Sequence, residues 1–548
     1  MKRLAGVLCL GLLPACGDGT GPSPAKEPAK VEPTSPFLIF DSIGAEVPLS
    51  VVVTDSGGGV VAGVIVTWQA QQGGVATPAS STTDASGIAS TTWKLGTGVG
   101  SQYITAIAGS RASVEIRAQA RAGAPAEVRI SEDSVLIGAV GDTRRVAASV
   151  RDRGGNVLTE ILQWTVRAPE LLQVERSIAT PDSFALTARG AGSTYAVAQV
   201  GGVRDSVKVR VPAWGFVATD YQRTCVLTPE GAAYCWGYNL GGAVGDGTAV
   251  TRTDPSPVST GLAFSAVSTG RHFTCGLTTA GAAHCWGANP YGEVGAGDEA
   301  MEHLTPRAVA GGRTFATLSA GFGSTCALTP AGEAFCWGAN FQGELGRDTL
   351  TDTCAASSVP RCSSVPLAVS GGLRFTRVSV GENNHVCAVT AAGEAWCWGQ
   401  NASSQLGTSV APDTCVFDLP CVRSPARVET ATAFTTIVAG WNYTCALDAG
   451  GQAWCWGMGF GARPAAIPGG RAFVEIDAGA GAMCGRTAAG AVYCWGSALG
   501  TTPLPRSGAL PVQSLSVGEA SLGSANVRIC GTLAGGGVQC WSGGSSQP

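Results

Sequence analysis

The stretch CALTPAGEAFCWG, from Cys326 to Gly338, decides the fold of most of this chain. Two cysteines stand ten positions apart, a Pro-x-Gly tripeptide lies between them, and Trp-Gly follows the second cysteine. The same cysteine spacing occurs seven times. The third residue of the central tripeptide is glycine in every copy: Gly231, Gly281, Gly332, Gly393, Gly451, Gly490 and Gly536. Such a strict repeat predicts one structural unit per copy.

The unit is predicted to be a β-hairpin. If Cys326 faces Cys336, then Thr329 faces Glu333 and the loop is 330–332. A three-residue hairpin loop is a type I turn followed by one left-handed residue, which suits proline first and glycine third. Counting outward, the cysteines form a non-hydrogen-bonded pair, with Cα atoms about 4.5 Å apart. Disulfides accept about 4.4 to 6.8 Å, so each copy can hold a cross-strand disulfide.

The twenty cysteines therefore predict a disulfide framework rather than a zinc site, because zinc ligands are more closely spaced and the N-terminal stretch MKRLAGVLCLGLLPAC predicts export. Two long inserts carry further pairs, and pairing within each insert accounts for the remaining exported cysteines. The nine predicted disulfides are Cys225–Cys235, Cys275–Cys285, Cys326–Cys336, Cys354–Cys362, Cys387–Cys397, Cys415–Cys421, Cys445–Cys455, Cys484–Cys494 and Cys530–Cys540.

Both faces of each hairpin are apolar, so both must be buried. A sheet covered on both sides and repeated seven times is typical of propeller blades. Each copy has a strand before the hairpin, and six have a proline-containing strand after it. The seventh copy ends at Cys540-Trp541-Ser542 without a fourth strand. We therefore expect an outside strand to close the ring, and 207–215 (VKVRVPAWG) is the candidate.

The pattern Cys-Ala-Leu-Thr-x-x-Gly, followed by Cys-Trp-Gly-x-Asn-x-x-Gly-x-x-Gly, resembles the regulator of chromosome condensation repeat. That family forms seven-bladed β-propellers, and the resemblance covers about Trp214 to Trp541. It implies an all-β propeller over 213–548. The Asn-x-x-Gly part is present in copies one to three, reduced to Asn401 in copy four, and absent from copies five to seven.

The N-terminal part predicts export and anchoring. Lys2 and Arg3 precede an apolar run over 4–13, which is too short to span a bilayer. The sequence Leu-Pro-Ala-Cys ending at Cys16 resembles a lipoprotein lipobox, which implies a signal peptide over 1–16 and a lipid on Cys16. The alternative is an ordinary signal peptide with a coincidental cysteine. Residues 17–36 carry five prolines and predict an extended tether.

Residues 37–120 and 121–212 predict two β-sandwiches, because short β-branched runs alternate with Gly and Asp turns. The segment 82–106 resembles bacterial Ig-like domains of the invasin and intimin type, and 162–174 resembles a second bacterial Ig-like group. These resemblances imply a stalk. Trp68 and Trp164 are expected to fill the two cores.

Function is expected on one face of the propeller. The turns between first and second strands, and those between third and fourth strands, share a face that varies from copy to copy. We call this the varied face. Loops on a rigid scaffold usually carry function, and aromatic residues and arginine dominate binding hot spots. The candidate residues are Tyr221, Arg223, Arg271, His272, Phe273, Phe322, Asn384, His385, Trp441, Asn442 and Tyr443. The alternative is that these side chains line or cap the central channel.

Catalytic patterns are sparse. Of four histidines, His284 takes an aromatic packing position, and Glu299 to His303 only faintly resembles an inverted zinc-protease motif. We expect no catalytic site, no metal and no cofactor. The net charge is −4, and no lysine follows Lys208. A nucleic-acid partner is therefore not expected, since it requires a basic stripe.

The leading hypothesis is a non-enzymatic, monomeric lipoprotein of the bacterial outer membrane or cell surface, which touches the membrane through its lipid alone. Its propeller would bind a protein or a glycan. The main alternative is an inhibitor or regulator of an envelope enzyme, for which the β-lactamase inhibitory member of the family is the precedent. Guanine-nucleotide exchange, as in the nuclear founder, is disfavoured by the expected export, the seven hairpin disulfides and the absence of lysines from the propeller region. A hydrolase that uses His303 or His385 is the fourth hypothesis.

Overall fold

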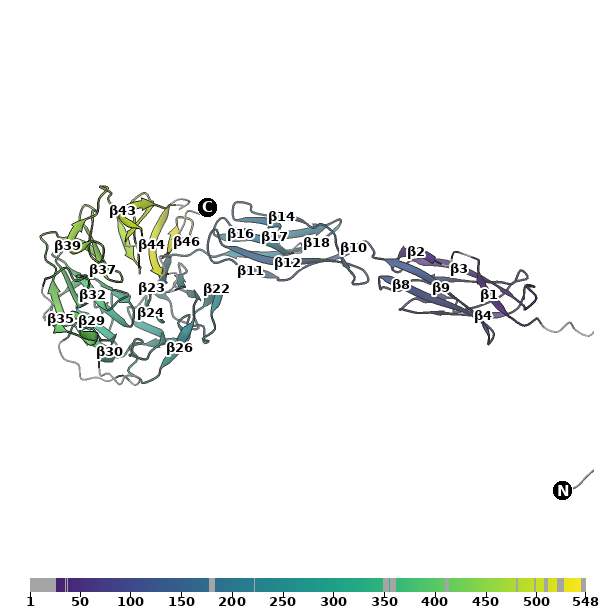
Figure 1. Ribbon diagram of the computed structural model, residues 1–548, viewed down its shortest axis with the longest axis horizontal. Coiled ribbons are helices and arrows are strands. Elements are labelled where there is room, and N and C mark those ends of the chain that lie inside the picture. The colour runs from purple at the N-terminus through teal and green to yellow at the C-terminus, as the bar shows by residue number, and fades with distance from the viewer. Residues whose placement is uncertain are drawn as a thin grey trace, which may run out of the picture. The chain divides into compact units, whose positions relative to one another are not determined.

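The computed structural model describes the chain from residue 26 to residue 543, except residues 35, 37, 177–182, 221, 348–353, 355–360, 410–412, 480, 497–498, 507–510 and 520–526. The leader with Cys16 and the candidate Tyr221 lie outside the described residues. Strands and turns make up nearly all of the described chain (Figure 1), and the helical elements there are two short 3-10 turns, η1 (Leu240–Gly242) and η2 (Val416–Asp418). The predicted all-β class is confirmed.

Contacts between Cα atoms group the chain into two compact units. One contains residues up to Arg129, Ala148–Gln163 and Ala198–Asp205, and the other contains Ile130–Ala147, Trp164–Val197 and Ser206–Pro548. The domain predicted over 121–212 therefore contributes residues to both units.

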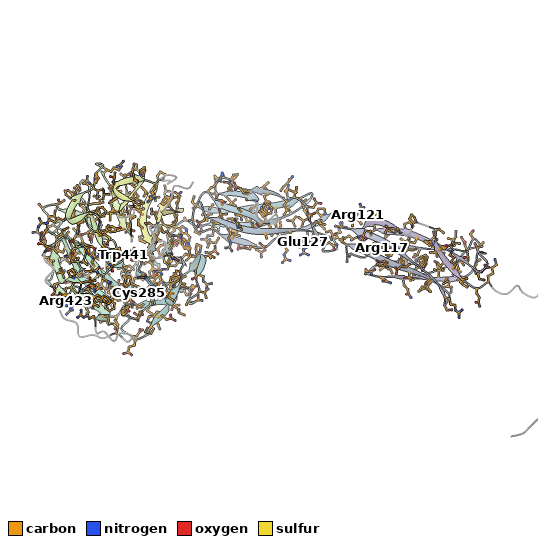
Figure 2. The ribbon with its side chains drawn as sticks, in the orientation of Figure 1. Arg117, Arg121, Glu127, Cys285, Arg423 and Trp441 are labelled. Carbon is orange, nitrogen blue, oxygen red and sulfur yellow. A yellow bond between two sulfur atoms is a disulfide. The ribbon has the colours of Figure 1, made fainter. Side chains whose placement is uncertain are left out.

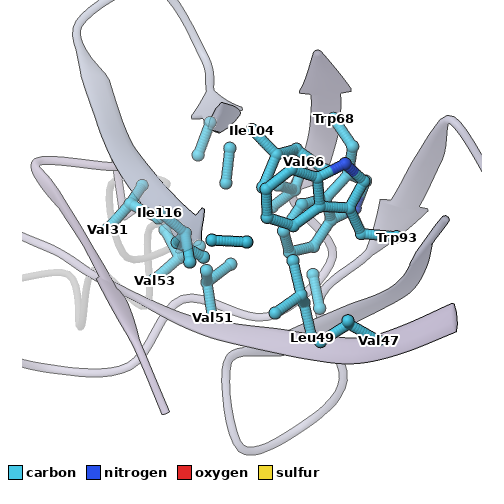
Figure 3. Packing of buried hydrophobic residues seen from close by; sticks show 14 of the residues in the cluster. Val31, Val47, Leu49, Val51, Val53, Val66, Trp68, Trp93, Ile104 and Ile116 are labelled. Carbon is cyan, nitrogen blue, oxygen red and sulfur yellow. The ribbon is translucent and has the colours of Figure 1, made fainter. Parts of the chain in front are cut away.

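The first sandwich has two sheets. Their strand orders are β1 (Lys30–Pro33), β3 (Glu46–Thr54), β7 (Ile88–Lys94), β5 (Val75–Thr77), and β2 (Leu38–Ser42), β9 (Ala112–Arg121), β8 (Gly100–Ala108), β4 (Ile65–Ala70), β6 (Ser80–Thr82). Trp68 lies in the core between them, as predicted, beside Trp93, which the sequence analysis did not single out (Figure 3).

The sandwich begins earlier than predicted. Residues 30–33, assigned above to the tether, form β1 and pair with β3, with Lys30 opposite Thr54. Val31 is 5% exposed and belongs to the core. The prolines were misleading because an edge strand tolerates proline on its unpaired side.

The second sandwich also has two sheets. Their orders are β10 (Pro125–Ile130), β12 (Thr143–Asp152), β16 (Ser183–Ala188), β15 (Leu172–Arg176), with β13 (Val157–Leu158) beside β12, and β11 (Ser134–Leu136), β18 (Val203–Val211), β17 (Gly192–Val200), β14 (Gln163–Val166). Trp164 is half-buried, and its ring centroid lies 4.6 Å from that of Phe184.

Seven antiparallel sheets follow, which we number as blades 1 to 7 in chain order. Their strands are β19 (Phe216–Asp220), β20 (Arg223–Leu227), β21 (Ala233–Gly237), β22 (Arg252–Pro257); β23 (Phe264–Thr269), β24 (Phe273–Thr278), β25 (Ala283–Ala288), β26 (Glu302–Ala308); β27 (Thr317–Ala320), β28 (Ser324–Leu328), β29 (Ala334–Ala339), β30 (Cys362–Ala368); β31 (Phe375–Val380), β32 (His385–Thr390), β33 (Ala395–Gln400), β35 (Pro420–Arg427) with β34 (Asp413–Thr414); β36 (Phe434–Ala439), β37 (Tyr443–Asp448), β38 (Ala453–Gly457), β39 (Gly461–Ala466); β40 (Glu475–Ala478), β41 (Met483–Arg486), β42 (Val492–Gly496), β43 (Gly500–Pro505); and β44 (Val512–Glu519), β45 (Val527–Leu533), β46 (Val538–Gly543). The first strand of each blade contacts the first strand of the next, and β44 contacts β19, so the ring closes.

The hairpin register is confirmed. Cys326 pairs with Cys336, and the Thr329 amide donates to the Glu333 carbonyl at 2.9 Å. The loop glycines have positive φ angles, for example 83° at Gly332. All nine predicted disulfides are present, and those inside the hairpins join Cα atoms 4.0 to 4.1 Å apart.

Neighbouring blades are joined by the tryptophan that follows the second cysteine. The Trp337 indole donates to the Glu293 carbonyl of the preceding blade at 2.9 Å. The loop that carries this carbonyl is itself fixed, because the Asn289 side-chain oxygen accepts the Val294 amide at 2.9 Å. Trp286 and Trp398 repeat the bond at two other seams.

The predicted closing strand is wrong. Val207 to Val211 belong to β18, which pairs with β11 of the second sandwich, and the sheet of blade 7 has three strands in the described chain. In blades 1 to 6 a positive-φ glycine after the tryptophan produces a bulge in front of the fourth strand. Blade 7 has Ser542 there, and the pairing of β45 with β46 continues without a shift.

The segment 138–140, which follows β11, lies in the seam between blades 7 and 1 instead. Ala139 is 1% exposed and packs in one cluster with Trp214 and Val538. The Val140 amide donates to the Val538 carbonyl, and the Trp214 indole donates to the Gly138 carbonyl, both at 2.7 Å.

Candidate binding face

The varied face is built from turns that neighbouring blades hold in place. The Arg271 amide donates to the Gly321 carbonyl of the next blade, and the Glu382 amide donates to the Gly440 carbonyl, both at 3.2 Å. Because the strands below are joined by disulfides, these turns are presented on a rigid base.

Four candidate residues are not on that face. Arg223, Phe273, His385 and Tyr443 are each at most 1% exposed. All four stand two positions before the first cysteine of a blade, inside the second strand rather than in the turn. The prediction that they offer a binding surface is therefore corrected: these side chains are buried.

Three of these side chains bond to the following blade. The Arg223 guanidinium donates to the carbonyls of Gly270 and Phe273, and burial lowers its pKa to about 10. His385 Nε2 lies 3.0 Å from the Thr444 hydroxyl, and burial lowers the pKa of this histidine to about 4. The Tyr443 hydroxyl donates to the Gly479 carbonyl at 2.8 Å. Each bond spans one seam of the ring.

Arg271, His272 and Phe322 are half-buried members of the varied face on blades 2 and 3. The Arg271 guanidinium carbon lies 4.6 Å from the centre of the Phe322 ring, a cation–π contact. Burial lowers the pKa of His272 to about 4, and the positive charge of Arg271 adds to this effect.

Among the described aromatic candidates Trp441 is the most exposed, at 42%, and it lies on blade 5 (Figure 2). The neighbouring Asn442 carbonyl accepts the amide of Met458, which is 47% exposed. The Asn442 side chain accepts a hydrogen bond from Asn383 of blade 4 at 2.8 Å, and Asn384 follows with a φ angle of 59°. Trp441 and Met458 are thus two exposed apolar side chains on backbone segments that the Met458–Asn442 hydrogen bond joins, and we call this pair the varied-face patch. Met458 was not predictable as a candidate, because its loop is one of those that lost the repeat pattern.

The central channel is a cavity of about 410 Å³ lined by the first strands of all seven blades. Its lining residues include Asp220, Glu382, Glu475 and Asp477 but no lysine, arginine or histidine. Glu475 is paired with Arg486, at 2.8 Å. Burial raises the pKa of Asp477 to about 7.

A set of serines in this channel joins the blades, and the sequence analysis missed them. The hydroxyl oxygens of Ser268, Ser319, Ser379 and Ser516 each accept a backbone amide of the next blade at 3.0 Å. Asp477 replaces the serine in blade 6 and accepts the Val517 amide at 2.7 Å. The sequence pattern that could have identified these serines is Ser-x-Gly at the end of the first strand, as in Ser268 to Gly270.

The arrangement around the remaining histidines is compatible with packing. His303 is 6% exposed, and its Nε2 lies 3.0 Å from an Asp298 carboxylate oxygen, while Arg307 donates to Nδ1 at 3.3 Å. Within the described ranges, no group of three or more His, Cys, Asp or Glu side chains is placed to hold a metal ion. The same part of the chain contains no helix with the length and apolarity that crossing a bilayer requires.

Comparison with known families identifies the repeat. Residues 264–293, 315–344 and 375–405, and residues 331–389 and 392–447, match two families that are both described as the regulator of chromosome condensation (RCC1) repeat. The chain therefore contains RCC1 repeats, in blades 2 to 5 of the propeller.

Individual relatives match over parts of their length. The chain is 29% identical over 144 residues to the mitochondrial RCC1 domain-containing protein RUG3 of Arabidopsis thaliana, covering 26% of this chain and 28% of that protein. It is 26% identical over 201 residues to the ultraviolet-B receptor UVR8 of the same plant, covering 36% of this chain and 43% of the receptor. The chain thus spans less than half the length of these curated relatives. Human WBSCR16, a solved structure, aligns with 57% of this chain and 86% of its own, at 18% identity and a TM-score of 0.49.

Proposed function

We propose that this chain is a non-enzymatic bacterial envelope lipoprotein whose propeller holds a protein or glycan partner on the varied face. The observation that carries the proposal is the exposed pair Trp441 and Met458, presented over hydrogen-bonded asparagines on disulfide-closed blades. A repeat fold that serves as a protein-binding platform supports it.

The rigidity of the turns under Trp441 favours binding. An exposed tryptophan contributes most to binding when it is already held in the bound conformation, because little ordering entropy is lost. The turns under Trp441 are tied across the seam between blades 4 and 5 by Asn383 and by the Glu382 amide. The Arg271–Phe322 contact offers a second, cationic and aromatic, point of attachment.

Binding is tested with the purified chain and two variants. Trp441→Glu places a charge in the proposed patch, whereas Glu230→Arg changes an exposed side chain on the hairpin face. Proteins of the producing bacterium's envelope and a glycan array serve as probes. A ligand retained by the natural chain and by the Glu230 variant, but not by the Trp441 variant, supports the proposal. Ligands bound equally by the Trp441 variant contradict it.

Location is tested by protease shaving of intact cells, followed by detection with an antibody against the propeller. Loss of the signal supports display on the outer surface and capture of external ligands. Protection until the outer membrane is breached would overturn surface display and favour regulation of an envelope enzyme. Inhibition of that enzyme by the purified chain then becomes the deciding measurement.

A further inference from the structure

The seam between blades 7 and 1 holds a second cavity, separate from the varied-face patch and from the channel. It lies within one compact unit, beside the inserted segment 138–140. Its volume is about 460 Å³, which is within the usual range of small-molecule pockets. Its lining residues are 136–138, 142–144, Gln222, 236–238, 251–255 and Arg528. We call it the seam cavity.

Most charges in its wall are already neutralised. Arg144 pairs with Asp254 at 2.8 Å and lies 3.7 Å from Glu132. Arg252 pairs with Asp246. These pairs fix the wall and leave two other charged residues for a ligand.

The two remaining groups are Arg528, from β45 of blade 7, and Asp142, from the turn before β12. Arg528 Nε is buried and has no hydrogen-bond partner. Among the described residues Arg528 forms no ion pair, although Asp142 lies near enough for the two charges to attract. Burial lowers the pKa of Arg528 and raises that of Asp142, and the attraction between the two charges partly offsets both shifts. A buried donor without an acceptor is rare in proteins and requires an explanation.

We propose that the seam cavity binds a small zwitterion with an α-amino acid head group. The ligand carboxylate accepts a hydrogen bond from the Arg528 guanidinium, and its ammonium group donates to the Asp142 carboxylate. The apolar part of the ligand contacts Trp236 and Tyr238, which line the same cavity. A ligand with only a carboxylate would leave Asp142 without an ammonium partner. A ligand with only an ammonium group would leave Arg528 without a carboxylate partner. This proposal is independent of the proposed function.

The test is calorimetric titration of the full chain. The zwitterionic probes are L-phenylalanine, L-leucine and glycine, and the charge-matched probes are N-acetyl-L-phenylalanine, a monoanion, and L-phenylalaninamide, a monocation. We expect at least one zwitterion to bind saturably, and both single-charge probes to bind about tenfold or more weakly, since each loses one charge-assisted hydrogen bond.

Two variants separate the site from a loss of folding. Asp142→Asn should lower the affinity for the zwitterion about tenfold. The same variant should bind N-acetyl-L-phenylalanine more tightly than the natural chain does. Arg528→Gln should weaken the zwitterion similarly and improve binding of L-phenylalaninamide. A gain in affinity requires an intact cavity, so it cannot arise from unfolding. Arg374→Gln, which removes an exposed ion pair with Glu333, is the matched control. It should leave the affinity for every probe unchanged.

The proposal is overturned if none of the three zwitterions binds at concentrations up to about 10 mM. It is equally overturned if Arg528→Gln leaves zwitterion binding unchanged, or if N-acetyl-L-phenylalanine binds the natural chain as tightly as L-phenylalanine does.

Discussion

The residue two positions before the first cysteine has one role in several blades: it reaches across the seam. Arg223, His385 and Tyr443 have different chemistry, yet each bonds a residue of the next blade. The position tolerates this variety because the acceptor is backbone in two cases and a hydroxyl in the third. A buried polar group is stable only when it is hydrogen-bonded, so the local partner determines which residue fits.

A second set of buried polar side chains lies in the loops after the third strands, and in blade 3 this side chain is Glu344. Glu344 is 0% exposed, accepts the Gln342 amide at 2.7 Å, and has its pKa raised to about 8 by burial. In blade 4 the equivalent residue is Gln405, whose side-chain oxygen accepts the Ser403 amide at 2.8 Å. The chain therefore already contains the neutral version of this site.

We predict that Glu344→Gln removes a pH dependence of stability. The folded state keeps Glu344 protonated up to about pH 8, whereas the unfolded chain ionises it near its ordinary pKa of 4.5. The natural chain therefore loses stability as the pH rises through this window, by at most about 1.4 kcal/mol per pH unit from this group. The variant should unfold at a higher temperature than the natural chain at about pH 8, with the difference shrinking toward pH 4.5. Thermal unfolding over the pH range measures this, and identical profiles for both chains would refute it. Glu333→Gln, at an exposed site, is the control.

The loop glycine of each hairpin has a positive φ angle, and in blade 3 it also lies close to the backbone of the next blade. Gly332 has a φ of 83°, and a Cβ added there would lie 2.8 Å from the Phe375 carbonyl oxygen. Gly312 has a φ of 60° but nothing within 4 Å of its Cβ position. The two glycines thus share the conformational requirement and differ in the space around them.

We predict that Gly332→Ala destabilises the chain more than Gly312→Ala. Gly312→Ala should cost about 1–2 kcal/mol for the left-handed conformation alone, and Gly332→Ala should cost this amount plus the displacement of Phe375. Urea unfolding monitored by tryptophan fluorescence gives both values. Equal losses of unfolding free energy would mean that the Phe375 backbone moves away from the added methyl group at no energetic cost.

The hairpins were predictable from sequence because every requirement lies within eleven residues. The loop glycine, the register and the disulfide follow from turn geometry, and the structure confirms them. The candidate face was less predictable. Whether Tyr443 points to solvent, as Trp441 does, depends on where the strand begins and on a carbonyl 36 residues away. The closing strand was wrong for a similar reason, since Val207 to Val211 alternate in a way that suits either partner sheet.

The serines of the channel act between elements, and Ser516 closes the ring by accepting the Thr219 amide. We predict that Ser516→Ala costs about 1–3 kcal/mol, because it leaves a buried amide without a partner. Ala218 occupies the corresponding position in blade 1, so alanine fits sterically. The comparison is Ser265→Ala. The Ser265 hydroxyl bonds within blade 2, so its loss should change the free energy of unfolding little. Chemical denaturation of both variants is the measurement, and equal stabilities would show that Ser516 does not hold the seam.

For the molecule as a whole, the propeller depends on a residue that precedes it by more than seventy positions. Ala139 lies at 1% exposure in the seam with Trp214, and blade 7 has no fourth strand in the described chain. The segment 138–140, which lies in the same compact unit as the propeller, therefore forms part of the seam between blades 7 and 1.

We predict that Ala139→Asp destabilises the propeller by about 3 kcal/mol or more, because it buries an unpaired charge at the seam. Ala124→Asp, at an exposed position, should have little effect. Limited proteolysis of both variants, with the cut sites located by mass spectrometry, should show earlier cleavage in blades 1 and 7 for Ala139→Asp alone. Cleavage that begins in blades 3 to 5 would contradict the assigned role of the seam.

The order of the disulfides has a consequence for biogenesis. Each of the nine bonds joins a cysteine to the next cysteine along the chain, and none encloses another. A chain that enters an oxidising compartment from its N-terminus can therefore close every native bond before the following pair arrives. Such a chain reaches its native pairing without reshuffling, which otherwise takes seconds to hours. An oxidase should suffice for its maturation, and a disulfide isomerase should be dispensable.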